Sequence, residues 1–88
     1  MLFMNIFTYE PEKRDEVIKR RAEKGAMTTA KIIGEWVVIG GGRVFSVLEV
    51  DDPKVGAAAS MAWSDLGHNE IIPIMSSEDV MKILASRK

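Results

Sequence analysis

The fold is decided by the stretch KIIGEWVVIGGGRVFSVLEV, residues 31–50. It contains two runs rich in β-branched and aromatic residues, Lys31 to Ile39 and Arg43 to Val50, separated by Gly40-Gly41-Gly42. The three glycines permit the positive φ angles that a tight antiparallel connection requires. A phosphate-binding glycine loop would be followed by a helix, whereas here a strand follows, so we interpret the stretch as a β-hairpin.

A helical segment flanks this hairpin on each side. On the N-terminal side, Pro11 stands at a first-turn position, where its missing N–H costs nothing, and Gly25 is the expected C-cap. On the C-terminal side, Asp52-Pro53 is typical of an N-cap followed by a first-turn proline. Apolar residues then recur at helical spacing until Gly67.

Two outer strands complete the pattern. They are expected over Leu2 to Tyr9 and from about Asn69 to Met75, which gives the order β-α-β-β-α-β of the ferredoxin-like split unit. We therefore predict a single α+β domain over residues 1–88, with a four-stranded antiparallel sheet and two helices on one of its faces. The run Ser76-Ser77-Glu78-Asp79 predicts the N-cap of a short C-terminal helix.

Composition excludes several classes of function. The 88 residues contain no cysteine, which excludes disulfides, thiolate metal sites and a cysteine nucleophile. A formal charge of −1 provides no field that would attract nucleic acid or an anionic membrane. The single histidine, His68, and scattered carboxylates do not make a metal site. We expect a soluble cytoplasmic protein with no signal peptide, no membrane span and no cofactor.

Alternation along the strands assigns side chains to two sheet faces. We expect a plain aliphatic core on one face, made of Leu2, Met4, Ile6, Val44, Ser46, Leu48 and Val50. The other face is expected to mix aromatic and polar groups: Phe3, Asn5, Phe7, Tyr9, Arg43, Phe45, Val47, Glu49, Trp36 and Val38. Two helices cover only one face, and each large apolar side chain left in water would forgo about 1.5–3 kcal/mol. The pattern therefore predicts a homodimer that forms through a sheet face.

A resemblance runs through nearly the whole chain. It is carried by five stretches: Met1-Leu2-Phe3-Met4, Gly34-Glu35-Trp36-Val37, Gly42-Arg43-Val44-Phe45, Glu49-Val50-Asp51-Asp52-Pro53, and Trp63-Ser64-Asp65-Leu66 through Glu70-Ile71-Ile72-Pro73-Ile74. Together they resemble a small uncharacterised single-domain family of the dimeric α+β barrel superfamily, in which two ferredoxin-like subunits pack their sheets together. The resemblance implies the fold and the dimer, but no activity. The small-residue run 56–60 departs from the bulkier helix expected there, which indicates a closer helix–sheet approach or a roomier cavity.

The superfamily includes cofactor-independent monooxygenases, haem-degrading monooxygenases and isomerases. Its haem-degrading members use an asparagine, a tryptophan and a histidine, and Asn5, Trp63 and His68 match those types. The spacing does not match, because His68 follows Trp63 by five residues and lies just past the helix-stopping Gly67. Those roles are therefore not transferred to this chain.

Five residues remain candidates for ligand binding: Asn5, Trp36, Glu49, Trp63 and His68. The two tryptophans could form a wall for a flat ligand, or could belong to the core or the dimer seam. Glu49 is a candidate general base within an apolar strand, or else a partner of a cation such as Arg43 or Lys31, or a residue of an exposed strand end. Asp65 could orient His68, or could be a polar residue of the last helical turn.

Three functions stay open. The first is a cytoplasmic homodimer that binds a small hydrophobic or aromatic molecule in a cleft between sheet and helices. The second is a cofactor-independent monooxygenase or isomerase that uses Glu49, His68 or Asn5 to handle protons, and the third is an accessory dimer with no ligand. RNA-recognition modules share the same element order, but Val47 and Val50 stand where stacking rings belong and Glu49 would repel phosphate, so no nucleic-acid partner is expected.

Overall fold

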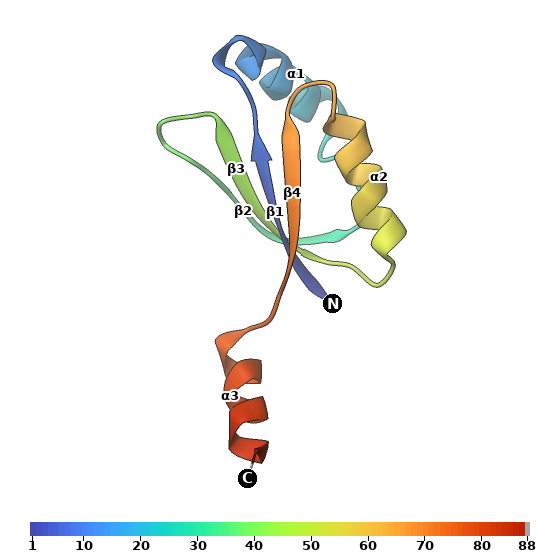
Figure 1. The fold of residues 1–88 in the computed structure, drawn as a ribbon. Helices are drawn as coiled ribbons and strands as arrows, with labels where there is room; N and C mark the ends of the chain where they lie inside the picture. The colour runs from blue at the N-terminus through green and yellow to red at the C-terminus, as the bar shows by residue number, and fades with distance from the viewer. Residues whose placement is uncertain (88) are drawn as a thin grey trace.

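The computed structural model describes residues 1–87 and has the predicted order of elements (Figure 1). A single antiparallel sheet with strand order β2-β3-β1-β4 makes the fold ferredoxin-like α+β, as predicted. The strands are β1 (Leu2–Thr8), β2 (Lys31–Val37), β3 (Arg43–Glu49) and β4 (His68–Ile74). The helices are α1 (Arg14–Lys24), preceded by the 3-10 turn η1 (Pro11–Lys13), then α2 (Pro53–Trp63) and α3 (Ser77–Ser86).

Three local signals act as expected at the element ends, whereas α2 ends at Trp63 and not at the expected stop, Gly67. Gly25 ends α1 with a φ of 69°, and its N–H donates to the Arg21 carbonyl. The Asp52 side chain accepts a hydrogen bond from the Lys54 N–H at 2.9 Å and so caps α2. Ser76 caps α3 in the same way, with its Oγ accepting from the Asp79 N–H at 3.0 Å.

The hairpin between β2 and β3 closes through its glycines. Gly41 and Gly42 have φ angles of 84° and 86°, a region that side chains rarely adopt. The Gly41 N–H donates to the Val38 carbonyl at 2.8 Å, and the Val38 N–H donates to the Arg43 carbonyl at 3.0 Å. The glycine run is therefore a turn between strands.

The strand register corrects the expected composition of the two faces. In β1 and β3, Asn5 lies opposite Ser46 and Phe7 lies opposite Val44, so the odd-numbered residues of β1 share a face with the even-numbered residues of β3. The sequence interpretation had separated them. The face beneath the helices thus carries Phe3, Asn5, Phe7, Val44, Ser46 and Leu48, whereas Leu2, Met4, Ile6, Phe45, Val47 and Trp36 lie on the opposite, open face.

Helices α1 and α2 lie on one side of the sheet, and the core forms there (Figure 1). Phe7, Val17, Trp63 and Leu66 are its buried cluster, and no described side chain is less than 2% exposed. Helix α3 extends beyond the end of β4, and none of its Cα atoms comes within 8 Å of another described helix or strand. Its apolar residues Val80, Met81, Ile83 and Leu84 are exposed.

Helix length and apolarity bear on membrane insertion. Within residues 1–87, no helix combines the length and the apolarity that crossing a bilayer requires.

Candidate functional site

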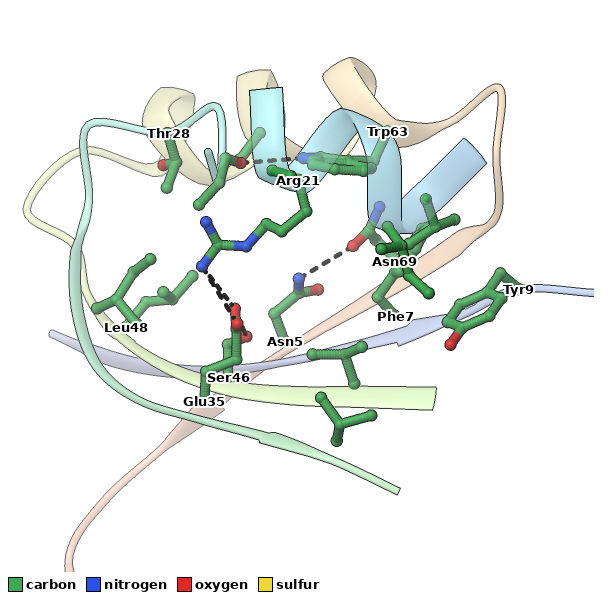
Figure 2. A pocket seen from close by; sticks show the side chains of 18 residues that line it. Asn5, Phe7, Tyr9, Arg21, Thr28, Glu35, Ser46, Leu48, Trp63 and Asn69 are labelled. Atoms are coloured by element: carbon green, nitrogen blue, oxygen red, sulfur yellow. Dashed lines mark hydrogen bonds and ion pairs between the residues drawn. The ribbon is translucent and has the colours of Figure 1, made fainter. Parts of the chain in front are cut away.

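A cavity of about 460 Å³ lies between the sheet and the two helices that cover it (Figure 2). This volume is within the range of small-molecule sites. Its floor comes from β1, β2, β3 and β4, and its roof from α1, α2 and the segment that follows α1. The lining residues are Asn5, Phe7, Tyr9, Val17, Ile18, Arg21, Ala22, Ala26, Thr28, Ile32, Glu35, Val37, Val44, Ser46, Leu48, Ala59, Trp63 and Asn69.

Small residues of α2 make part of this space. Ala59 lines the cavity, and a Cβ added at Gly56 would lie 3.8 Å from the Ile71 side chain. Of the two expected consequences of the small-residue run, the structure shows the roomier cavity, at Ala59. At Gly56 a Cβ would make only an ordinary contact with Ile71, so glycine is not needed there for the helix to approach the sheet.

Trp63 forms an aromatic wall of the cavity. Its indole N–H donates to the Ala26 carbonyl at 2.9 Å, which fixes the ring against the segment after α1 (Figure 2). Its edge meets Phe7, with ring centroids 5.8 Å apart and planes at 63°. The side chain is 9% exposed, so it is at once a core residue and a cavity wall.

The other side of Trp63 carries a tight ion pair. The Arg20 guanidinium lies 5.5 Å from the Trp63 ring centroid and donates two hydrogen bonds of 2.7 Å to Asp65. These hydrogen bonds lower the pKa of the Asp65 carboxyl to about 2. Asp65 therefore binds Arg20, which favours the interpretation of Asp65 as a polar residue near the end of α2 over a role in orienting His68.

The floor of the cavity has one polar row between two apolar rows. Glu35, Ser46 and Asn5 are successive cross-strand partners on β2, β3 and β1. On β2, β3 and β1 the rows on either side are apolar, with Val37, Val44 and Phe7 in one and Ile32, Leu48 and Phe3 in the other. The first row continues to Asn69 on β4, and Phe3 of the second row lies outside the cavity lining.

Arg21 reaches from the last turn of α1 to this polar row. Its Nη2 lies 3.2 Å and 3.4 Å from the two Glu35 carboxylate oxygens, and the Ser46 hydroxyl donates to Glu35 at 3.4 Å (Figure 2). The pair balances charge at the cavity, because one cation faces one carboxylate.

Asn5 occupies the centre of the floor and is only partly satisfied. Its Nδ2 donates to the Asn69 Oδ1 at 3.0 Å, and Asn69 in turn donates to the Ser60 carbonyl at 3.4 Å. The Asn5 Oδ1 is buried and has no hydrogen-bond partner among the described residues. A buried acceptor without a partner is costly, and such groups in native proteins are uncommon.

The structure divides the five candidate residues. Asn5 and Trp63 both line the cavity. Trp36 is 58% exposed on the open face, where its ring covers Gly34. Glu49 ends β3 and binds the N-terminal ammonium of Met1 at 2.6 Å, and His68 begins β4 opposite Thr8. Of the three residues expected to handle protons in an oxygenase or isomerase, Asn5 lines the cavity, whereas Glu49 and His68 do not.

Most polar residues of the cavity were not predicted as site residues, among them Arg21, Thr28, Glu35, Ser46 and Asn69. A signal was present for Ser46, a hydroxyl between Val44 and Leu48 at an inward strand position. Glu35 gave a weaker signal, because a one-residue irregularity between Ile32 and Gly34 shifts which residues of β2 face the helices.

Metal ligands do not gather in residues 1–87. That part of the chain has no cluster of three or more histidine, aspartate or glutamate side chains placed to hold an ion.

Comparison with known proteins places the whole chain in one group. The model of the family described as Domain of unknown function (DUF3303) matches residues 1–88. No curated protein and no solved structure gives a significant match.

Proposed function

Because the chain belongs to the DUF3303 family, which has no assigned function, we propose a role from the cavity itself: the protein binds a small apolar or aromatic molecule there. The observation that carries the proposal is a space of about 460 Å³ walled by Trp63 and Phe7, with few polar groups directed into it. Sites of this kind bury a ligand against hydrophobic side chains and orient it with a small number of polar contacts.

The apolar dye N-phenyl-1-naphthylamine, whose emission rises when water is excluded, tests this proposal. A Trp36→Phe background leaves Trp63 as the single tryptophan, so energy transfer to the dye reports on the cavity wall. We expect a saturable rise in dye emission with one site per chain, together with quenching of Trp63.

A matched pair of α2 variants locates the dye. Ala59→Phe puts a ring into the cavity and should weaken dye binding at least 10-fold, whereas Ala57→Phe puts the same ring on an exposed position of the same helix. Equal binding by the two variants, or no rise in emission for the parent protein, would contradict the proposal.

The open sheet face supports a second part of the proposal, a homodimer of the dimeric α+β barrel kind. This face carries Met4, Ile6, Phe45 and Val47 on the two central strands, and its flanking residues Trp36 and Ile72 are 58% and 38% exposed. A single antiparallel sheet with a wet face normally has polar residues there. Association with a second copy of the chain would bury these side chains and leave the cavity on the outer side of each sheet.

A further inference from the structure

Two arginine–carboxylate pairs in this protein differ in the length and geometry of their hydrogen bonds. Arg20 and Asp65, outside the cavity, meet at 2.7 Å through two hydrogen bonds. Arg21 and Glu35, which line the cavity, meet at 3.2 Å and 3.4 Å through one nitrogen. Charge-assisted hydrogen bonds are usually about 2.7–2.9 Å long, so the Glu35 carboxylate keeps capacity to accept a shorter hydrogen bond.

The hydroxyl next to Glu35 is also loosely engaged. The Ser46 Oγ lies 3.4 Å from the Glu35 carboxylate, whereas hydroxyl hydrogen bonds are usually about 2.7–2.8 Å long. Ser46 is 8% exposed and lies between apolar residues. Beside it, Asn5 has a buried oxygen without a partner among residues 1–87. The protein's own groups therefore leave part of the hydrogen-bonding capacity of this polar row unused.

The charge of the cavity restricts what can use this row. Arg21 and Glu35 already balance each other's charge, although Arg21 meets Glu35 through one nitrogen and keeps its other N–H groups. A charged ligand would therefore add an unbalanced charge to a partly buried site, which is unfavourable. An uncharged hydroxyl can donate to Glu35 and accept from Ser46 without breaking the pair.

From these contacts we propose that the ligand is an uncharged, flat, largely apolar molecule that carries a hydroxyl group, held against the row Glu35–Ser46–Asn5. This inference rests on the proposed function, because it specifies the ligand class of the same cavity. The apolar rows on either side of the polar row fit the body of the molecule, and the polar row fits its hydroxyl.

Three naphthalenes of nearly equal size separate the possibilities at pH 7: 2-naphthalenemethanol is uncharged with a hydroxyl, 2-methylnaphthalene is uncharged without one, and 2-naphthoate is an anion. Calorimetric titration of the full chain should rank the alcohol first. One additional hydrogen bond corresponds to roughly a 3- to 10-fold lower Kd than that of the methyl compound. Ser46→Ala should bring the Kd values of 2-naphthalenemethanol and 2-methylnaphthalene closer together.

Glu35→Gln removes the carboxylate that balances Arg21, and so tests whether the balanced charge of the cavity is what disfavours an anionic ligand. It preserves side-chain size and leaves Arg21 without a carboxylate partner, so the affinity for 2-naphthoate should rise about 3- to 10-fold. Glu23→Gln removes a carboxylate from α1 outside the cavity and should leave the affinity for 2-naphthoate unchanged.

The outcomes separate the two proposals. Equal Kd values for the alcohol and the methyl compound, or tighter binding of 2-naphthoate by the parent protein, would overturn the hydroxyl inference and leave the cavity as an apolar binding site. Failure of all three compounds to bind would overturn the proposed function, and the inference with it.

Discussion

At the level of single residues, the ion pair between Arg20 and Asp65 makes the free energy of unfolding depend on pH in the acid range. Arg20 belongs to α1 and Asp65 follows α2, and Arg20 also donates to the Ala62 carbonyl at 3.1 Å, so the pair joins the two helices. The pKa of Asp65 is about 2 in the folded protein and 3.8 as a reference value for the unfolded chain. A carboxyl group whose pKa is lower in the folded state stabilises that state at pH values above its pKa in the unfolded chain. This contribution is lost as the pH falls from about 4 toward 2.

Asp65→Asn should therefore lower the melting temperature at pH 6 and lower it much less at pH 2, where protonation of the carboxylate has removed most of the contribution. Thermal unfolding followed by circular dichroism at both pH values measures the difference. Glu23→Gln, which removes a carboxylate from α1 without touching this pair, serves as the control and should not reproduce the loss at pH 6. A melting difference that is the same at both pH values would contradict the ion-pair account.

Residue-level prediction from sequence succeeded where the cause is local. Gly25, Asp52 and Ser76 act within four residues of their own positions, and each has the capping role expected of it. Asp65 could not be placed, because its partner Arg20 lies 45 positions away and meets it only when α1 and α2 lie side by side. Asn5 and Trp63 were selected by residue type, and the fold brings both to the cavity.

At the scale of elements, Gly67 sets how closely the connection between α2 and β4 approaches β1. The sequence marked this glycine as a helix stop, but a Cβ there would collide with the Thr8 carbonyl oxygen and approach the Phe7 ring to 2.8 Å. Gly67→Ala should therefore destabilise the fold by about 1–3 kcal/mol, because an overpacked site must shift its neighbours.

Gly40→Ala is the matched control for this prediction. A Cβ added at Gly40 would have no heavy atom within 4 Å, and Gly40 lacks a positive φ, so the change should cost little. Urea unfolding of the two variants gives the comparison. An equal free energy of unfolding would show that the close approach at Gly67 is not required.

Element pairing also explains why side chains were assigned to the wrong faces of the sheet. Alternation along each strand is readable from sequence, because it has a period of two residues. Whether the odd-numbered side chains of β1 share a face with the odd- or the even-numbered side chains of β3 depends on the register of the two strands. No short hairpin joins these strands, so the sequence does not set that register. The pairing of β2 with β3 is set by the glycine turn, and there the expected neighbours Trp36 and Phe45 do lie opposite each other.

At the scale of the whole molecule, the proposed dimer predicts a mass of about twice 9.8 kDa. Val47 lies on a central strand of the open face, so Val47→Asp would place a charge in the seam and should shift the sedimentation coefficient to that of a single chain. Met61→Asp changes a residue of α2 that is 75% exposed and should leave the mass unchanged. Sedimentation of the parent protein as a single chain at about 100 µM would contradict the dimer.

Intermolecular nuclear Overhauser effects reveal whether a small molecule binds in the space between the sheet and the helices. With 2-naphthalenemethanol added to isotope-labelled protein, the ring protons should show cross-peaks to Phe7, Val44 and Trp63, which line the cavity. Cross-peaks only to Met4, Val47 and Ile72, on the opposite face of the same sheet, would contradict binding in the cavity.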